Sequence, residues 1–431
     1  MARLLTQKDV YSIVNAMVED LTGQQSTIRA VDTSTFVSVG EQILAQGTEN
    51  VLNELGLLVG RILVAARPYK GGRFNLINAI DTGIYTHRLL KISYFSGKAL
   101  PSGAFNTDLY TNLKDGFTNG QNLDANDQPQ STKSMWEQHM YEPMTLNFAG
   151  SSVWQECVTI PEVQLQQAFR SEVEFNEFFS GIMIRHENDI ELEKEAFRTA
   201  LVLNQIGAIY DLRASMPGSV VNLTAGFNEF YYGSDTSNYK TSAELRSTYL
   251  KEFLGYMVFV IKNDIKKMQN ESVKFHWSPA SQSGGALLRH TPKDKQKLFL
   301  YEPLMLQAEA NVLPEIFNEK YLSLDKNYEG VEFWQNEEDP SAVKVTPAIP
   351  DVDSTSATYG TQIAGSAVTL PYVVGLLFDE DAMMVDFQLE RADSTPLEAR
   401  KLYRNLWLTI SKNLIGDLTE KQILYIMADP T

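Results

Sequence analysis

The sequence predicts an α+β fold, in which long helices and groups of β-strands occupy separate parts of the chain. Helical periodicity dominates two long stretches, whereas alternating or continuous apolar patterns typical of strands occur before, between and after them. The chain has 431 residues, of which 43% are hydrophobic and 10% aromatic. A chain of this length and composition can bury a sizeable core, and it favours two to four domains or lobes.

The first part of the chain, residues 1–60, predicts a helical arm. Helical periodicity begins near Thr6, is expected to end at Gly23, and resumes across residues 33–60. No stretch reaches about 18 consecutive apolar residues, and the N-terminus lacks the apolar core of a signal peptide. We therefore expect a soluble product that is not secreted.

Residues 61–161 predict an extended β excursion with a long tip. In "IYTHRLLKISYF" the apolar residues Leu90, Ile92 and Tyr94 alternate with polar ones, which predicts a hairpin with one apolar face. Residues 97–140 lose this periodicity and are rich in Asn, Asp, Gly and Ser, as in a long loop. Strand character then resumes in "MTLNFAGSSVWQECVTIP" and closes the excursion.

The single cysteine, Cys157, lies in the last of these strand segments. One cysteine cannot form an internal disulfide, and this cysteine usage is compatible with a reducing compartment. We expect a buried structural thiol at this position rather than a nucleophile.

A long helix is predicted after the excursion, because neither Pro nor Gly interrupts residues 182–206. The pair Ser180-Gly181 is expected to kink or end a shorter helix that precedes it. Apolar residues on one stripe of the long helix are expected to face the core. These residues are Met183, Ile190, Phe197 and Leu201, with Leu192, Ala196 and Leu203 broadening the stripe towards the C-terminal end.

A second helix is predicted from Thr241 to about Asn270. Thr241 and Glu244 have the spacing of a capping box, and the nearly all-round apolar middle predicts a buried helix. Short strands and Pro-rich loops follow as far as Gly375. The chain then ends with the alternating strand "LYRNLWLTISKN" and the apolar strand "QILYIM".

The charge of the chain is strongly negative and unevenly distributed. The formal net charge of −17 argues against a dedicated nucleic-acid-binding protein. Residues 61–98 carry a local balance of +6, whereas residues 171–195 carry one of −6. Opposite patches of this kind predict pairing within the chain or between copies of it.

The acidic stretch "RHENDIELEKE" lacks the spacing of a metal site. His186 and Glu187 begin the zinc-protease pattern, but Ile190 stands where the second histidine is required. The carboxylates of residues 379–381 are another candidate cation site, although carboxylates at the end of a strand more often cap the next element. With no phosphate-binding glycine loop and no nucleophile elbow in the sequence, we assign no catalytic or metal-binding residue and expect no cofactor.

Three stretches carry a resemblance to a known family. They are "EQILAQGTENVLNELGLLVGRILVAARP" before the excursion, "EFFSGIMIRHENDIELEKEAF" in the long helix, and "GLLFDEDAMMVDFQLER" followed by "LYRNLWLTISKNLIGDLTEKQILYIM" at the end. With the order of elements, they resemble the major capsid proteins of tailed bacteriophages, which share the Johnson fold, also called the Hong Kong-97-type phage capsid fold. The resemblance is strongest to the small short-tailed phages that use protein-primed replication.

The resemblance implies a division of the chain into an N-terminal arm, an extended β E-loop, a long spine helix, a peripheral (P) domain and an axial (A) domain. The expected boundaries are 1–60 for the arm, 61–161 for the E-loop, 162–240 for the spine helix and P-domain, 241–375 for the A-domain with inserted loops, and 376–431 for terminal strands that return to the P-domain.

The function implied by the resemblance is that of a major capsid protein and not of an enzyme. Such proteins self-assemble as hexamers and pentamers into an icosahedral shell around phage double-stranded DNA. The expected partners are other copies of the chain, a portal protein, a separate scaffolding protein, and packaged DNA through non-specific contact, with no membrane. The expected location is the virion capsid, after assembly in the cytoplasm of the bacterial host.

In this family the E-loop reaches across a neighbouring subunit and lies over its spine helix. We therefore hypothesise that the basic stem of the E-loop docks against the acidic flank of a neighbour's long helix. The basic residues are Arg61, Arg67, Lys70, Arg73, Arg88, Lys91 and Lys98. The acidic residues are Glu187, Asp189, Glu191, Glu193 and Glu195.

Two alternatives stay open. An encapsulin-like protein compartment has the same fold, but such shells tend to be shorter and the long excursion disfavours this function. An unrecognised cytoplasmic metal-dependent enzyme would place the carboxylates of 379–381 or 337–339 around a metal ion between two lobes.

Overall fold

The structure is a computed structural model of the chain. It describes residues 73–80, 88–95, 142–149, 152–161, 172–281, 286–311, 327–396, 398 and 400–429, together with isolated positions before residue 40. Most of the predicted arm, the first part of the predicted stem and the predicted tip at 97–140 lie outside these residues. The described part of the chain mixes helices with several β-sheets, so the predicted α+β class is confirmed.

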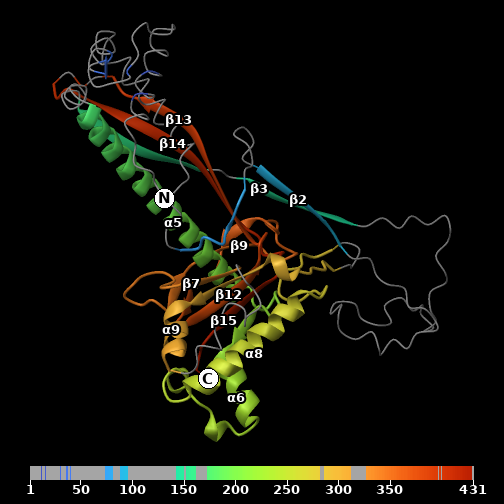
Figure 1. Cartoon of the computed structure of the whole chain (residues 1–431). Coiled ribbons are helices and arrows are strands. Elements are labelled where there is room, and N and C mark those ends of the chain that lie inside the picture. Colours follow the sequence, from blue (N-terminus) through green and yellow to red (C-terminus); the bar gives the residue numbers. More distant parts are fainter. Residues whose placement is uncertain are drawn as a thin grey trace, which may run out of the picture.

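The longest element is the helix α5, which runs from Glu172 to Asp211. Its 40 residues give a length of about 60 Å at 1.5 Å per residue (Figure 1). The expected kink or end at Ser180-Gly181 is wrong, because the helix continues through both residues. A single glycine costs a helix only about 1 kcal/mol relative to alanine, so it does not interrupt a long helix by itself.

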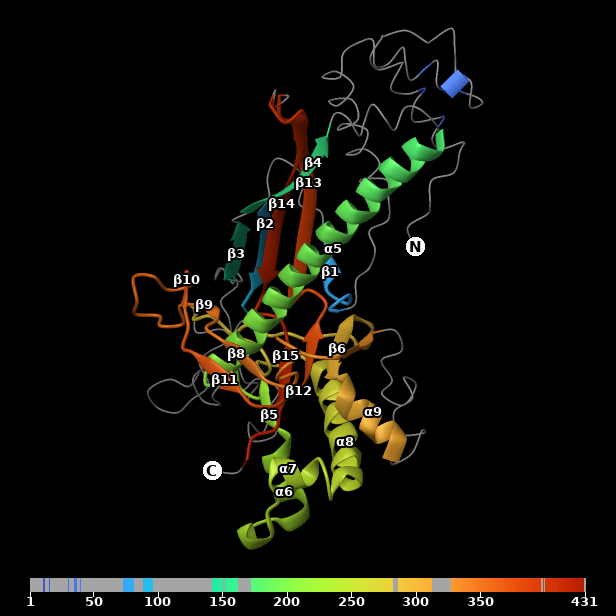
Figure 2. The same ribbon diagram turned by 90° about the vertical axis from the view of Figure 1, so that its left-hand side faces the viewer.

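A four-stranded sheet lies along one side of α5 (Figure 2). Its order is β1-β13-β14-β4, and its strands are β1 (Asn78–Ala79), β13 (Met383–Ser394), β14 (Tyr403–Gly416) and β4 (Ser152–Pro161). The ring of Phe197 on α5 packs between Trp154 of β4 and Phe387 of β13, with ring centroids 6.0 and 6.3 Å away. Strand β4 therefore belongs to the sheet beside the long helix, although the sequence placed it in the excursion.

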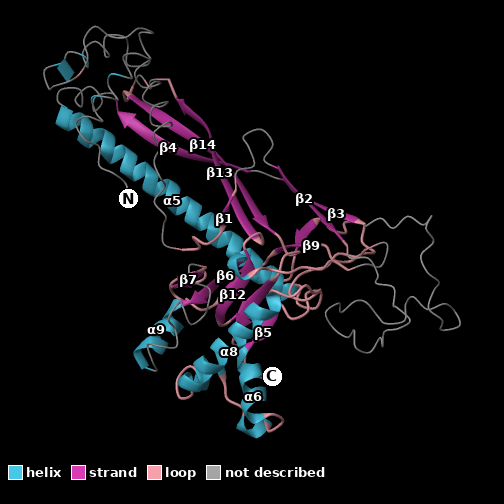
Figure 3. Ribbon diagram, turned by 45° about the vertical axis from the view of Figure 1, so that its right-hand side comes forward, coloured by secondary structure: helices cyan, strands magenta, loops and turns pink. Residues whose placement is uncertain are grey.

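A five-stranded sheet forms the centre of the second lobe (Figure 3). Its order is β5-β15-β12-β6-β7, with β5 (Val220–Asn222), β15 (Gln422–Ile426), β12 (Val373–Asp379), β6 (Gln296–Tyr301) and β7 (Tyr328–Val331). All residues of β12 and β15 are buried, because this sheet is covered on both faces. The final strand β15 thus lies in this sheet, whereas β13 and β14 lie beside α5.

The helices of this lobe are α6 (Leu223–Tyr232), α7 (Ser242–Leu245), α8 (Leu250–Met268) and α9 (Glu302–Asn311). The predicted capping box is confirmed, since Thr241 accepts a hydrogen bond from the Glu244 amide and donates its own amide to the Glu244 carboxylate. The predicted single helix over 241–270 is wrong, because α7 ends after one turn and α8 begins at Leu250. In the part of the chain that the structure describes, no helix is long and apolar enough to cross a membrane.

The remaining elements are short. The excursion contributes an antiparallel hairpin of β2 (Arg88–Tyr94) and β3 (Pro143–Ala149). Two further antiparallel pairs join β8 (Val343–Val345) to β11 (Val368–Leu370) and β9 (Ala348–Pro350) to β10 (Gln362–Ala364). Two 3-10 turns, η2 (Thr236–Asn238) and η3 (Lys293–Lys295), complete the described elements.

Candidate functional site

Strand β2 of the hairpin displays its apolar face to the outside of the chain, whereas Met144 and Leu146 of β3 lie on the inner side. The side chains of Leu90, Ile92 and Tyr94 are 48%, 56% and 61% exposed. Between them, Lys91 is half-buried and Ser93 is buried against the body of the protein. The sequence predicts the alternation correctly, but in the single chain the strand turns its polar side inwards and its apolar side outwards.

The inward face of β2 is fixed by charges from the last loop of the chain. The Lys91 ammonium forms ion pairs with both Asp417 and Glu420, whose side chains are only 1% and 9% exposed. Burial alone would lower the pKa of Lys91, but the two carboxylates raise it above its ordinary value, so this lysine stays charged. The guanidinium of Arg289 joins the same cluster, donating to the Ser93 hydroxyl at 2.7 Å and lying 3.4 Å from Glu420.

The acidic flank of α5 is partly paired within its own chain. Glu191 is buried, and its Oε1 accepts two hydrogen bonds of 3.3 Å from the guanidinium of Arg198. Glu195 accepts a 2.9 Å hydrogen bond from Nε of Arg73. The guanidinium of Arg73 also lies 3.7 Å from the ring centroid of Phe333, so it is held on two sides.

The residues of the predicted electrostatic match thus divide into three groups. Arg73 and Lys91, the two basic residues whose side chains the structure describes, both contact acids of their own chain. Among the acids, Glu191 and Glu195 are paired within the chain, Glu193 is exposed and Asp189 is half-buried. The side chains of the remaining residues lie outside the described part of the chain; they are Arg61, Arg67, Lys70, Arg88, Lys98 and Glu187.

The outer face of α5 carries a narrow apolar stripe. Leu192 is 65% exposed, and Ala196 and Ala200 follow it at intervals of four residues, also exposed. The prediction that Leu192 and Ala196 face the core is therefore wrong. The helix instead turns Ile190 and Leu201, 8% and 5% exposed, towards the protein.

Cys157 is exposed on β4, so the prediction of a buried thiol is wrong. The residues of β4 alternate between the face towards α5 and the opposite face, and Cys157 falls on the opposite one. Its partial burial, helped by Glu156, raises the pKa of the thiol, which disfavours the reactive thiolate.

Of the two carboxylate clusters that the alternative metal-dependent enzyme would use, the structure shows a structural role for Asp379. Asp379 is buried and accepts a 2.9 Å hydrogen bond from the Asp381 amide, which caps the turn after β12. Asp339, at the end of the second cluster, donates its amide to the Asn336 side chain in an exposed turn. Among the described residues, no group of three or more His, Cys, Asp or Glu side chains could hold a metal ion.

Sequence reasoning missed the partners of the hairpin. Asp417 and Glu420 lie 326 and 329 residues after Lys91, and no local pattern connects them. The available sequence signal was that both acids lie in a short turn between two strongly apolar strand patterns. This signal does not distinguish a buried carboxylate from an exposed one.

A protein-family model described as Phi29-like phage major capsid protein matches residues 94–425. None of the curated proteins matches the chain.

Solved structures similar to this one come from phage particles. A chain in the capsid structure of Staphylococcus phage Andhra is 11% identical, with a TM-score of 0.49 over 84% of this chain and 86% of that chain. A chain in a structure of native bacteriophage P68 is 12% identical, with a TM-score of 0.47 over 83% and 85% of the two chains. A chain in the capsid structure of the cyanophage P-SCSP1u is 10% identical, with a TM-score of 0.38 over 85% and 90%.

Proposed function

Because the chain belongs to the Phi29-like phage major capsid proteins, we propose that its copies assemble as hexamers and pentamers into an icosahedral shell around phage double-stranded DNA. Family membership makes the protein a shell-forming capsid component. The observation that carries the proposal is the family match, which extends from β2 to β15 and so includes both lobes. The hairpin, the long helix with its adjoining sheet, and the second lobe have the order of the Johnson fold.

The domain scheme follows from this fold. We assign residues 1–60 to the N-terminal arm, and the hairpin of β2 and β3 to the E-loop. We assign α5 with the sheet β1-β13-β14-β4 to the spine and P-domain, and the five-stranded sheet with α6 to α9 to the A-domain. Because β4 pairs with β14 and β15 pairs with β12, we assign β4 to the P-domain and β15 to the A-domain, which differs from the boundaries that the sequence suggests.

We propose that the outward face of the E-loop hairpin lies on the spine helix of a neighbouring copy. The hairpin offers Leu90, Ile92 and Tyr94, and the helix offers the apolar stripe around Leu192. Burying a large apolar side chain contributes about 1.5–3 kcal/mol, whereas an exposed ion pair contributes about 0–1 kcal/mol. The apolar faces therefore supply the larger part of the binding energy in this proposal.

The charged residues then have two roles. Arg73 and Lys91 brace the stem within its own chain through their ion pairs. We retain the electrostatic match between the other basic residues of the stem and the acidic flank of the neighbour's long helix. Exposed charges of this kind steer association and fix register more than they add affinity.

The proposed role is purely structural. We propose no catalytic activity and no cofactor, and as partners a portal protein, a separate scaffolding protein and DNA held by non-specific contact. The net charge of −17 supports the last point, because an acidic inner wall repels packaged DNA. The proposed place of assembly is the host cytoplasm.

Electron microscopy tests the proposal directly. The protein is expressed alone and with a candidate scaffolding protein from the same genome, and large particles are collected by sedimentation. Closed shells, or rings of six and five copies, are the expected result. A monodisperse monomer or dimer under both conditions would contradict it, and a single enzyme packaged inside the particles would favour the encapsulin-like alternative.

A further inference from the structure

An exposed aromatic patch covers the side of the second lobe where α6 meets α8. It consists of Phe230 and Tyr231 from α6 and Phe259 from α8, which are 61%, 49% and 54% exposed. The ring centroid of Phe230 lies 5.1 Å from that of Tyr231 and 5.9 Å from that of Phe259. The three rings therefore form one continuous surface.

The patch is rigid because buried and half-buried aromatics support it from below. Phe227, which is 1% exposed, lies 4.5 Å from the Tyr231 ring, and Tyr256 lies 5.5 Å from the Phe230 ring. Rings held in this way lose little conformational freedom when a partner covers them. Contiguous exposed apolar surface of this kind marks an interaction site, and aromatic side chains are typical of the residues that dominate binding energy.

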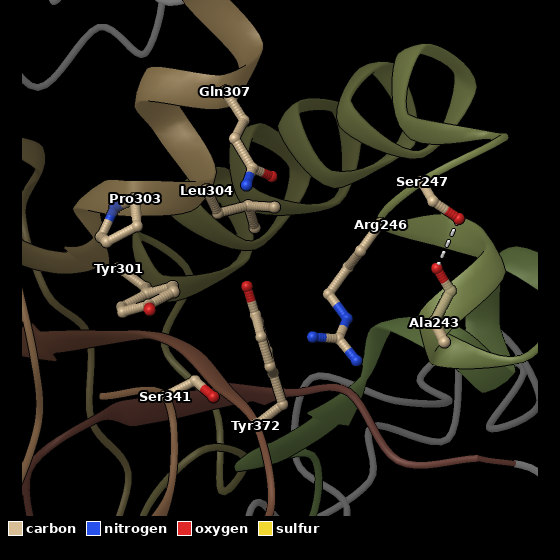
Figure 4. A pocket seen from close by; sticks show the side chains of 9 residues that line it. All are labelled: Ala243, Arg246, Ser247, Tyr301, Pro303, Leu304, Gln307, Ser341 and Tyr372. Carbon is tan, nitrogen blue, oxygen red and sulfur yellow. Dashed lines mark hydrogen bonds between the residues drawn. The ribbon is translucent and has the colours of Figure 1, made fainter. Parts of the chain in front are cut away.

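A pocket lies on the same lobe, between α9 and the segment that begins in α7. Residues of α9 form one wall of the pocket, and Ala243, Arg246 and Ser247 form another (Figure 4). The cavity has a volume of about 400 Å³. Its lining includes Arg246, Tyr301, Pro303, Leu304, Gln307 and Tyr372 (Figure 4).

The chemistry of this pocket suits an aromatic side chain. The Arg246 guanidinium lies 4.3 Å from the Tyr372 ring centroid, which leaves a planar cation with one of its two faces stacked. Pro303 and Leu304 supply an apolar wall opposite (Figure 4). Among the described residues Arg246 forms no ion pair, and no acidic residue lines the cavity, so no carboxylate competes for the cation.

The aromatic patch and the pocket are two different surfaces of one lobe, as contact around a ring requires. Copies related by a rotation other than a two-fold contact each other head to tail, so each copy needs one surface that binds and a different one that is bound. We infer that the aromatic patch of one copy packs into the pocket lined by Arg246 in the next copy around each ring. This inference rests on the proposed shell. Phe230, at the centre of the patch, is the side chain that enters the pocket.

Cross-linking of assembled particles tests this contact while leaving its aromatic and cationic residues in place. Glu229 is exposed beside the patch and Gln307 lines the pocket, so Glu229→Cys and Gln307→Cys are combined in a Cys157→Ser background. A short bis-maleimide is then added to purified shells. The expected result is a ladder of covalent multimers up to the ring size, with no ladder from either single variant or from Glu229→Cys combined with Val153→Cys, at an exposed position of β4.

The other outcomes are distinguishable. Shells without a ladder in the double variant would overturn the inference and leave the proposed function intact. A covalent dimer from Glu229→Cys alone would also overturn it, because the patch would then meet its own copy. Absence of any shell from the parent protein would remove the proposed function and this inference together.

A variant series provides an independent test. Phe230→Ala is expected to lower the yield of sedimenting particles about tenfold or more, in line with the loss of a central aromatic anchor. Val153→Ala, at a side chain of similar exposure on β4, is the matched control and is expected to leave the yield unchanged. The melting temperature of the unassembled chain is measured for both, so that a folding defect is recognised.

The double variant Phe230→Ala with Arg246→Ala separates a direct contact from two unrelated defects. If the two side chains meet, the double variant assembles no worse than the poorer single variant. If the loss of yield in the double variant equals the product of the losses in the two single variants, the inference is overturned. Normal assembly of Phe230→Ala alone, with failure only in the presence of the scaffolding protein, would overturn it as well and assign the patch to that partner.

Discussion

The E-loop hairpin and the five-stranded sheet use apolar strands in opposite ways. In the sheet, every residue of β12 and β15 is buried within the chain. In the hairpin, the apolar residues of β2 face outwards, and the inner side is held by the Lys91 ion pairs and a small cluster of Phe95, Met144 and Leu287. The sheet therefore stabilises the single chain, whereas the hairpin presents apolar surface to another chain.

This difference predicts that equivalent apolar substitutions have different consequences in the two regions. In the sheet they should lower the free energy of unfolding of the single chain. At the outward residues Leu90, Ile92 and Tyr94 of the hairpin they should leave this free energy nearly unchanged and impair assembly.

Leu377→Ala in β12 should have the largest effect on stability. The side chain is 0% exposed, and removing it leaves a cavity in the central strand. The free energy of unfolding is expected to fall by about 2–5 kcal/mol. Urea denaturation followed by circular dichroism measures this change. A loss below about 1 kcal/mol would contradict the statement that the sheet stabilises the single chain more than the hairpin does.

Lys91→Met should have the second-largest effect, confined to the hairpin. The substitution leaves Asp417 and Glu420 buried without their main cation, which costs about 2–3 kcal/mol at a site that is partly exposed. Native-state hydrogen exchange should therefore show protection of the β2 and β3 amides reduced by about 30-fold or more. Lys91→Arg keeps the charge and serves as the control, and unchanged protection in Lys91→Met would show that the ion pairs do not hold the hairpin.

The free energy of unfolding should depend on pH through His276, which is buried and whose ring nitrogens contact the backbone carbonyls of Lys274 and Leu287. Burial lowers the pKa of His276 from 6.5 to about 4, so the folded chain excludes a proton that the unfolded chain binds. Stability is then greatest above pH 6.5, and it falls by about 2 kcal/mol between pH 7 and pH 5 from this residue. Denaturation at both pH values should show the loss in the parent chain and not in His276→Gln. An equal loss in both would contradict the assignment.

Ile92→Ser should have the smallest effect on stability and a large one on assembly. The side chain is 56% exposed in the single chain, so the free energy of unfolding is expected to change by no more than about 0.5 kcal/mol. Val153→Ser, at 57% exposure on β4, is the control for exposed apolar surface. If shell formation falls in Ile92→Ser and not in Val153→Ser, the outward face of β2 is covered by a neighbour. Normal assembly of Ile92→Ser would show that it is not.

Much of the fold was predictable because its signals are local. The long helix, the capping box at Thr241 and the terminal strands β14 and β15 all follow from periodicity and capping residues that lie close together in the sequence. The family resemblance drawn from these elements is confirmed by the family match. The errors fall where local signals are ambiguous, as at Gly181, which the helix tolerates, and at residues 246–249, where the helix stops without a Pro or Gly.

The candidate surfaces were less predictable. The helical stripe predicts Leu192 in the interior and the strand segment predicts a buried Cys157, and both are exposed. A shell-forming protein keeps apolar surface for its partners, so in such a chain an apolar residue does not by itself indicate the core. The aromatic patch was not predicted for the same reason, since Phe230 and Phe259 belong to helices that also carry buried apolar residues such as Phe227 and Leu254.

The sequence by itself determined the long helix, the capping box at Thr241 and the terminal strands, and it determined that Leu90, Ile92 and Tyr94 share one face of β2. Only the tertiary structure decided whether that face turns inwards. A two-residue period defines two faces of a strand but says nothing about which one meets the core. That choice depends on Asp417 and Glu420, which fold back on Lys91 from the far end of the chain and make its polar side the buried one.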